Sequence, residues 1–409
     1  MKKILFYCQY LAGMGHLIRS TEIIRSLVQD FEVCLINGGQ LVRGFDFPPE
    51  ARVIHLPAVW EDGNELKAVD SLMTIDEVKE SRKQKILAVL AKFQPDCIVT
   101  ECFPFSKHKL KFELVPMLKQ AKSSQRDIAI VCSLRDLIMT QPMSEEARTR
   151  RQQKVCKLIN RYYDLVLFHG DAKLLRLEDS FPSVAQLNCP VYYTGYVAPA
   201  PQASLANLAH TLEDIISLNQ SEPTIVASVG GGRHGYPLLK AILAANPIIQ
   251  AALPLKIYCF AGPFMEQSEF QQLQQVAANQ DNVILRRFTP RLTEYMQQAD
   301  LSVSLGGYNT IMNILTTKVR SLVLPSLNEH QSDEQSIRAK KLAELGIINL
   351  LHREDLEPSS LAQKIISGLA RKPAQHSFDL EGAKAVSSVL QVLLNNSNRQ
   401  KLPLSLIAD

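Results

Sequence analysis

Short apolar runs alternate with helical patterns along almost the whole chain, and this alternation restricts the possible folds more than any other feature. In the first half the apolar runs lie at 4–8, 32–36, 53–56, 97–100, 128–132 and 165–168. Helical patterns lie between most of them, at 16–28, 81–92, 107–122 and 145–160. Strands of a parallel sheet are buried on both faces and are joined by crossover helices. The first half therefore predicts a doubly wound α/β sheet.

The same alternation restarts in the second half, after a change in composition. A segment opened by Pro199-Ala-Pro201 is polar and only modestly helical, which is typical of a linker. The apolar runs beyond it lie at 225–229, 256–260, 283–285, 301–305, 321–324 and 347–351. A chain of 409 residues is long enough for two domains. We expect two Rossmann-like domains that face each other across a cleft: 1–198 and 223–375, with a linker at 199–222 and a C-terminal helix and tail at 376–409.

Composition and charge exclude several classes of protein. A hydrophobic fraction of 46% and a charged fraction of 21% are ordinary for a globular chain, and a net charge of +4 gives no reason to expect nucleic acid as a partner. The eight cysteines form no CxxC pair and no zinc-spaced cluster with histidine, so we expect buried thiols and no metal. No apolar run reaches the roughly 18 residues of a membrane span, and the N-terminus lacks a signal-peptide cleavage site. These features predict a cytoplasmic protein.

Two glycine-rich segments in the second half each follow an apolar run and precede a helical pattern. One is Gly230-Gly-Gly-Arg-His-Gly235 and the other is Gly306-Gly-Tyr-Asn-Thr310. Glycine lets backbone N–H groups approach an anion closely, and a helix N-terminus favours negative charge. The two segments therefore predict a cradle for a diphosphate, to which Arg233 or His234 adds positive charge. A flexible hinge loop is the alternative interpretation of the first segment.

An acid–amide pair, Glu334-Gln335, follows the second glycine segment by about two dozen residues. Carboxylate and amide groups accept from and donate to sugar hydroxyls. An isolated pair of this kind is usually part of a solvated helix face, but its spacing from Gly306 and Gly307 favours a role in binding. A diphosphate cradle together with a polyol-binding pair indicates a nucleotide-sugar.

A third glycine loop, Gly13-Met-Gly-His16, follows the first apolar run. It is not the dinucleotide fingerprint GxGxxG, because Ile18 stands where the third glycine belongs and no acidic residue ends the second run; a nicotinamide cofactor is therefore disfavoured. His16 is expected to project toward the cleft, where a neutral imidazole can take a proton from an acceptor hydroxyl. The alternative is a helix-capping histidine without chemistry.

Two carboxylates also come directly after apolar runs. Glu101 lies in Thr100-Glu-Cys-Phe-Pro-Phe105, and Asp136 lies in Ser133-Leu-Arg-Asp136. Functional groups gather at the carboxyl ends of strands in a doubly wound sheet, so either carboxylate can orient His16. Glu101 can instead contact an acceptor or cap the following helix. We take His16, Glu101 and Asp136 as catalytic candidates.

Basic residues cluster in the first half, within 107–111 and 148–157. Solvated helix faces are the ordinary interpretation of such clusters. The sharper interpretation is a surface for an anionic or lipid-linked acceptor, with a peripheral contact to a membrane.

In their order and spacing, these motifs resemble the GT-B glycosyltransferases over nearly the full chain. The similarity is greatest to predicted glycosyltransferases related to the bacterial enzyme that adds N-acetylglucosamine to the lipid-linked peptidoglycan precursor. Tyr193-Thr-Gly-Tyr196 and Arg338-Ala339 add to the match. The resemblance implies that the second domain holds a nucleotide-diphosphate sugar, expected to be a UDP-sugar, and that the first domain holds the acceptor, with His16 as base. It also implies that Phe288 contacts the nucleotide base.

One position departs from that family. Relatives commonly have a ribose-binding glutamate three residues after the threonine, where this chain has Asn313, whose amide lacks the charge that strengthens such a hydrogen bond. Gly13 and Gly15 form the expected acceptor loop. The donor-side candidates are Gly230, Gly231, Gly232, Arg233, His234, Phe288, Gly306, Gly307, Asn309, Thr310, Asn313, Glu334 and Gln335.

The resemblance predicts an enzyme, a hexosyltransferase of GT-B type that needs no cofactor and acts with either inversion or retention. Two other functions stay open. In a nucleotide-sugar hydrolase on the same fold, the motif Gly13-Met-Gly-His-Leu-Ile-Arg19 positions His16 to activate water. A non-catalytic protein that binds a nucleotide-sugar is favoured by Asn313.

Overall fold

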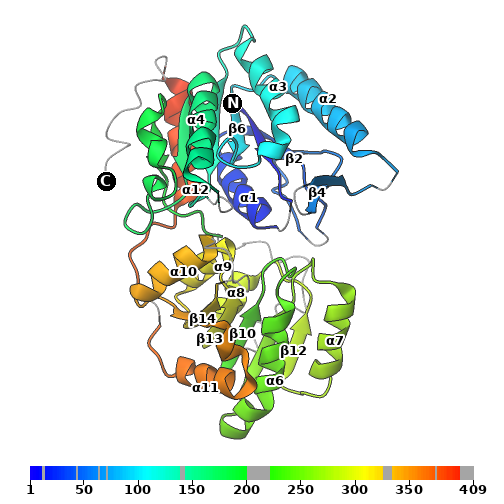
Figure 1. The fold of residues 1–409 in the computed structure, drawn as a ribbon, viewed down its shortest axis with the longest axis vertical. Helices are drawn as coiled ribbons and strands as arrows, with labels where there is room; N and C mark the ends of the chain where they lie inside the picture. The colour runs from blue at the N-terminus through cyan, green and yellow to red at the C-terminus, as the bar shows by residue number, and fades with distance from the viewer. Residues whose placement is uncertain are drawn as a thin grey trace.

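The computed structural model describes residues 1–11, 14–42, 45–62, 65–70, 72–138, 143–199, 222–325, 334–373 and 375–396. Figure 1 shows two lobes, one above the other, each with helices packed around a central sheet. Residue 13 and residues 200–221, most of the expected linker, lie outside the described part of the chain. The domain boundaries expected from sequence therefore stay predictions.

The upper lobe in Figure 1 is built on a seven-stranded parallel sheet. Its strands, in order across the sheet, are β3 (Arg52–His55), β2 (Glu32–Asn37), β1 (Lys3–Cys8), β6 (Cys97–Glu101), β7 (Ala129–Leu134), β8 (Leu165–Phe168) and β9 (Val191–Tyr193). The helices of this half are α1 (Gly15–Leu27), α2 (Ile75–Phe93), α3 (Lys111–Lys122) and α4 (Glu145–Tyr162). Each central strand is buried, as its apolar sequence requires.

The lower lobe is built on a six-stranded parallel sheet. Its strands, in order, are β12 (Val283–Arg286), β11 (Lys256–Phe260), β10 (Thr224–Ser228), β13 (Leu301–Leu305), β14 (Ser321–Leu324) and β15 (Asn349–Leu350). Its helices are α6 (Tyr236–Ala252), α7 (Gln267–Ala277), α8 (Leu292–Gln298), α9 (Tyr308–Thr317), α10 (Glu334–Glu344) and α11 (Pro358–Leu369). The doubly wound α/β class predicted from the apolar runs is confirmed.

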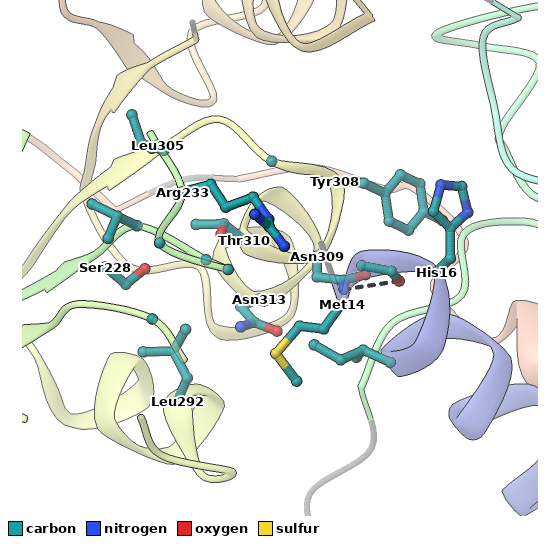
Figure 2. Close-up of a pocket in the computed structure, with 18 of the residues that line it drawn as sticks. Met14, His16, Ser228, Arg233, Leu292, Leu305, Tyr308, Asn309, Thr310 and Asn313 are labelled. Carbon is teal, nitrogen blue, oxygen red and sulfur yellow. Dashed lines mark hydrogen bonds between the residues drawn. The ribbon is translucent and has the colours of Figure 1, made fainter. Parts of the chain in front are cut away.

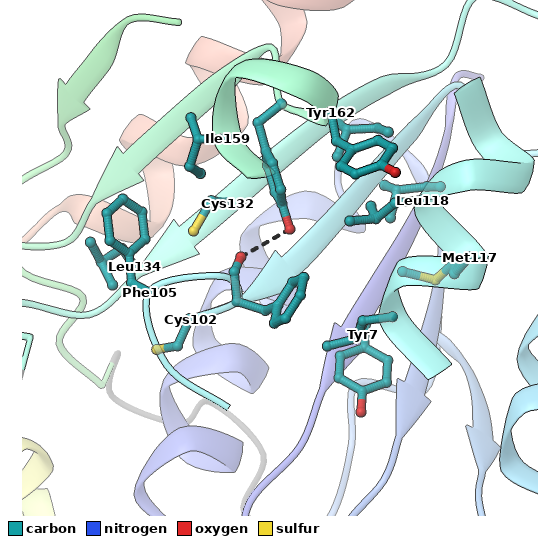
Figure 3. Close-up of a cluster of buried hydrophobic side chains, with 14 of the residues drawn as sticks. Tyr7, Cys102, Phe105, Met117, Leu118, Cys132, Leu134, Ile159 and Tyr162 are labelled. Atoms are coloured by element: carbon teal, nitrogen blue, oxygen red, sulfur yellow. Dashed lines mark hydrogen bonds between the residues drawn. The ribbon is translucent and has the colours of Figure 1, made fainter. Parts of the chain in front are cut away.

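Local capping explains where several helices begin. Thr74 and Glu77 form a reciprocal capping box at the start of α2, and Ser144 accepts from the Ala147 amide at the start of α4. Once started, α3 and α4 cover one face of the first sheet. Figure 3 shows Met117 and Leu118 of α3, and Ile159 and Tyr162 of α4, in one buried cluster with Tyr7 of β1 and Cys132 of β7. This packing fixes the strand ends that carry the functional side chains.

The chain passes from the first lobe to the second and then returns. The last helix of the described residues, α12 (Gly382–Asn395), packs against α1 in the first lobe and buries Val389, Leu390 and Leu393. On its way it pairs with the outgoing chain: Val197 and Glu381 form an antiparallel bridge, and the Gly382 amide donates to the Tyr196 carbonyl at 3.0 Å. The C-terminal helix is therefore part of the first lobe's core.

Two further features were not expected from the sequence. A small antiparallel pair, β4 (Val59–Asp62) and β5 (Glu65–Ala68), stands outside the main sheets, and β9 extends the first sheet by one strand. Within the described part of the chain, no helix combines the length and apolar character needed to cross a membrane.

Candidate functional site

The strand orders place the candidate residues at two particular points. In the first sheet the direction of winding reverses between β1 and β6, and in the second it reverses between β10 and β13. Ligands of doubly wound sheets bind beyond the carboxyl ends of the strands at such switch points. His16 follows β1 and Glu101 ends β6, whereas the two glycine segments follow β10 and β13.

A cavity of about 1570 Å³ lies between the two lobes and is lined by residues of both. Figure 2 shows His16 and Met14 on its first-lobe side, opposite Arg233, Thr310 and Asn313. All donor-side candidates except Gly306 line this cavity, as do Gly15 and His16. Glu101 and Asp136 are fully buried beside it. Gly13, the other member of the expected acceptor loop, lies outside the described residues.

The first glycine segment requires glycine for two separate reasons. Gly230 and Gly232 have φ values of 58° and 94°, in the left-handed region that side chains disfavour. A Cβ on Gly232 would also lie 2.4 Å from the Ala261 carbonyl oxygen, because the segment packs closely on the loop after β11. Arg233 and His234 are exposed at the cavity, and the Arg233 guanidinium lies 5.4 Å from the Phe264 ring centre.

The second glycine segment brings a helix N-terminus to the same cavity. α9 begins at Tyr308, directly after Gly307, and no side chain caps it. Gly306 packs against Pro325, with its Cβ position 3.1 Å from the Pro325 Cα, so it acts behind the cavity wall. The free amides of the first turn of α9 and the glycine segment after β10 together suit a bound anion.

His16 and Glu101 form a hydrogen-bonded pair at the first switch point. The His16 Nδ1 lies 2.6 Å from Glu101 Oε1; the imidazole is 26% exposed and the carboxylate fully buried. Arg19, from the next turn of α1, also contacts Oε1, and Lys107 contacts Oε2. Of the three interpretations that the sequence left open for Glu101, this contact favours the one in which it orients His16.

These contacts set the charge state of the pair. Burial lowers the pKa of His16 to about 3, although the Glu101 carboxylate acts in the opposite direction. Burial would raise the pKa of Glu101, but His16, Lys107 and Arg19 together hold it well below its usual range. The result is a neutral imidazole held by an ionised carboxylate. With Nδ1–H donated to Glu101, the remaining lone pair of the ring is on Nε2.

His16, Glu101 and Cys102 also place three possible metal ligands within 4.8 Å of one another. The surrounding charges oppose a divalent cation there, because Arg19 and Lys107 already occupy the two oxygens of Glu101. In addition, burial and Glu101 raise the pKa of the Cys102 thiol, which disfavours the thiolate that a metal needs.

In the structure Glu101, and not Asp136, is the carboxylate that contacts the His16 ring. Asp136 Oδ2 accepts from Arg338 Nε of α10 at 2.6 Å, so this carboxylate serves a contact between the lobes. Burial would raise the pKa of Asp136, but Arg338 and Arg135 hold it below its usual range. The physical reason is position: β6 is the neighbour of β1, whereas β7, which precedes Asp136, lies one strand further away.

Other candidates have partners that the sequence did not predict. Asn309 donates from Nδ2 to the Gly15 carbonyl of the first lobe at 3.1 Å (Figure 2). Phe288 lines the cavity and packs against the apolar cluster of the first lobe. Asn313 is 6% exposed, and its Oδ1 accepts from the Thr293 hydroxyl at 3.3 Å. Glu334 contacts Arg135, while Gln335 lines the cavity.

Sequence reasoning missed the guanidinium groups that surround this site. The guanidinium carbons of Arg19, Arg135 and Arg338 lie 5.6, 5.9 and 5.3 Å from the ring centre of Tyr308. Each of these residues was within a quoted motif, but none was assigned a role. Only the role of Arg19 could have been predicted from the sequence, because Arg19 is one helical turn after His16 and so lies on the same face of the helix.

Comparison with known proteins finds a domain match in the second half of the chain and solved structures with the same fold. Residues 226–390 match the family model of the glycosyltransferase family 28 C-terminal domain. The crystal structure of Acinetobacter baumannii MurG aligns with a TM-score of 0.55 and 15% identity, over 95% of this chain and 99% of that one. Phytolacca americana UGT2, complexed with UDP-2fluoro-glucose and pterostilbene, aligns with a TM-score of 0.58 and 13% identity, over 98% and 97%. The protein has the GT-B fold, and its second half resembles a glycosyltransferase domain.

A curated relative is similar over part of the chain. The UDP-N-acetylglucosamine--N-acetylmuramyl-(pentapeptide) pyrophosphoryl-undecaprenol N-acetylglucosamine transferase of Natranaerobius thermophilus is 24% identical over 164 residues. The alignment covers 38% of this chain and 44% of that protein, so the chain spans less than half the length of this relative.

Proposed function

We propose that the protein transfers a sugar from a nucleotide-diphosphate sugar, specifically a UDP-sugar, to an acceptor hydroxyl, with His16 as general base. The observation that carries this proposal is the arrangement across the cavity. A neutral imidazole, oriented by Glu101, stands on one side, and a glycine cradle beside a helix N-terminus stands on the other. Such an arrangement suits an acceptor above and an anionic leaving group below.

The residues suggest a displacement with inversion at the anomeric carbon. The acceptor hydroxyl gives its proton to His16 Nε2 as its oxygen bonds to that carbon, while the bond to the diphosphate breaks and its electron pair leaves with the phosphate oxygen. The α9 N-terminus, the amides of the segment after β10 and Arg233 would stabilise the departing charge. Glu334 and Gln335 would bind sugar hydroxyls.

On its first-lobe side the cavity is lined by more cations than carboxylates: Arg25, Lys107, Lys109, Arg135 and Arg151 against Glu22, Asp46 and Glu61. We propose an anionic acceptor on this modest excess of positive charge. A lipid-linked acceptor and a peripheral membrane contact are consistent with the undecaprenol-bound substrate in the name of the Natranaerobius relative.

A thermal-shift screen with UDP, UDP-glucose and UDP-N-acetylglucosamine tests the donor. A ligand at 100 times its Kd stabilises the native state by about 2.7 kcal/mol, so a true donor raises Tm clearly. A donor-bound crystal structure should place the diphosphate between Gly230–Gly235 and Gly306–Thr310. A diphosphate bound at Gly15 and His16 instead would place the donor in the first lobe and refute the proposed assignment of donor and acceptor sites.

Turnover assays separate the proposal from its rivals. Release of UDP that depends on an added acceptor supports transfer. Free sugar formed without any acceptor would instead identify a hydrolase in which His16 activates water. Tight binding of a UDP-sugar without turnover, whether or not an acceptor is added, would identify a non-catalytic binding protein. Asn313, which stands where relatives commonly have a glutamate, favours this alternative.

A further inference from the structure

A cluster of charged side chains lies between the His16–Glu101 pair of the first lobe and the Glu334–Gln335 pair of the second. It contains the cations Arg19, Lys107, Arg135 and Arg338 and the carboxylates Glu101, Asp136 and Glu334. Its members come from α1, from the segments after β6 and β7, and from α10, so it crosses the cleft between the lobes. Its ion pairs form two sets, one around Glu101 and one around Asp136 and Glu334. The Tyr308 ring lies between the two sets, because Arg19 of the first and Arg135 and Arg338 of the second lie 5.3 to 5.9 Å from its centre.

Arg135 has the central place in this cluster. It follows β7, its side chain is 18% exposed, and it lines the cavity. Its guanidinium contacts Glu334 of the other lobe, and its Nε lies 3.6 Å from Asp136 Oδ1. Glu334 and Asp136 raise the pKa of Arg135 above its usual value, despite burial, so the cation is permanent.

The contact leaves Glu334 with free binding capacity. A carboxylate can accept about four hydrogen bonds through its two oxygens, and a guanidinium on one side leaves the other side for a ligand. Glu334 is the first residue of α10 and lines the cavity, with 14% of its side chain exposed. The adjacent ion pair of Arg338 with Asp136 is fully buried and anchors α10 to the first lobe.

We propose that Arg135 is a positioning residue for the donor sugar: it fixes the Glu334 carboxylate across the cleft and so sets the sugar's place relative to His16. This inference rests on the proposed function. It assigns a specificity role to a first-lobe residue, whereas the other sugar-contacting candidates lie in the second lobe. A displacement of about 1 Å at the reacting carbon is enough to cost roughly 100-fold in rate.

The test compares ligands with and without the sugar. Calorimetry with UDP, UDP-glucose and UDP-N-acetylglucosamine is performed on the wild type, Arg135→Gln and Arg135→Lys. We expect Arg135→Gln to weaken binding of the preferred UDP-sugar by about tenfold, the scale of one charged hydrogen bond, and to leave UDP binding unchanged. Arg135→Lys keeps the charge without the planar fork and should recover part of the loss. kcat should fall further than KM rises.

Two matched variants make the result specific. Arg126→Gln removes another guanidinium–carboxylate contact, with Asp96 at 3.2 Å, from a residue that does not line the cavity; it should change neither affinity. Glu334→Gln should weaken UDP-sugar binding in the wild type, but cost little more in the Arg135→Gln background, since the two residues act as a unit.

The outcomes separate this inference from the proposed function. If the wild type binds no UDP-sugar, both fall. If the wild type binds one and Arg135→Gln binds it equally well, the positioning role alone is refuted. Tighter binding in Arg135→Gln would refute it too, because Arg135 would then compete with the sugar for Glu334. Equal losses of affinity for UDP and for the UDP-sugar would also refute it, because Arg135 would then act on phosphate binding or on the stability of the fold.

Discussion

At the scale of single residues, His16 depends on the buried carboxylate beside it. Because Glu101 fixes the Nδ1 side of the ring, the basic Nε2 is left for the substrate. We expect His16→Ala to lower turnover by roughly 10²–10⁴-fold, the usual effect of removing a general base, with little change in UDP affinity. Steady-state kinetics and calorimetry on the same variant provide the check. Intact turnover would leave His16 with only a structural role, through its contact with Glu101, and lost UDP binding would place it in the donor site.

The depressed pKa of His16 gives a second prediction. An ordinary histidine loses its basic form as pH falls through about 6.5. Because burial lowers the pKa of His16 to about 3, its neutral form persists well below that value. We therefore expect kcat/KM, which reports the free enzyme, to show no acid limb near pH 6.5. A limb between pH 6 and 7 that shifts in Glu101→Gln would contradict this.

Residue types and their order along the chain predicted His16 and Glu101, but not which carboxylate would reach the imidazole. Both Glu101 and Asp136 follow buried strands, and only the strand order decides between them. That order depends on contacts far apart in sequence, such as Ile4 beside Cys97. The roles of Arg19, Arg135 and Arg338 were not predicted for the same reason, because each is paired with a carboxylate from another element.

At the scale of elements, the segment between β10 and α6 illustrates how closely two loops must approach. Gly232→Ala should cost about 1–3 kcal/mol for the left-handed backbone, and more for the 2.4 Å approach to Ala261. It should also weaken UDP binding. Gly346→Ala is a matched control, because Gly346 has φ 71° but nothing within 4 Å of its Cβ position. Urea unfolding of both variants checks the prediction, and equal losses would show that the close approach relaxes.

Most strands could be predicted because central parallel strands are apolar on both faces. The runs expected at 165–168, 256–260, 301–305 and 321–324 match their strands in full. β9 was missed because its three residues are only half buried at the sheet edge, and 347–351 shrank to a two-residue strand for the same reason. Edge strands lack the periodic signal on which such predictions depend.

At the scale of the whole molecule, the last helix stabilises the first lobe. Leu390 of α12 is fully buried against the cluster that contains Ile23 and Leu27 of α1. We expect Leu390→Ala to lower the free energy of unfolding by about 2–5 kcal/mol. Ser388→Ala, on the exposed face of α12, should change it by less than about 0.5 kcal/mol. A loss as small for Leu390→Ala as for Ser388→Ala would show that packing of α12 contributes little to stability.

The sequence pattern predicted α12 as a helix but not its location. An apolar helical stripe shows that a helix is buried, yet it does not name the surface that covers it. Here the partner lies at the other end of the chain, where Ser387 donates to Asp30 at 2.6 Å.

The bridge between Val197 and Glu381 has a mechanical consequence for the cleft. A single tether would let one lobe twist and tilt freely against the other. Here the outgoing and returning chain segments are hydrogen-bonded to each other, so we expect them to act as a single hinge. Such a hinge restricts twisting of the lobes and permits mainly a rotation about the Val197–Glu381 bridge. The ring centre of Tyr196, which is next to Val197 in the chain, lies 6.4 Å from the ring centre of Tyr308. The charged cluster therefore lies close to the axis of this hinge. We expect groups near such an axis to move least in a swing of the lobes, which would keep His16 and the donor site aligned.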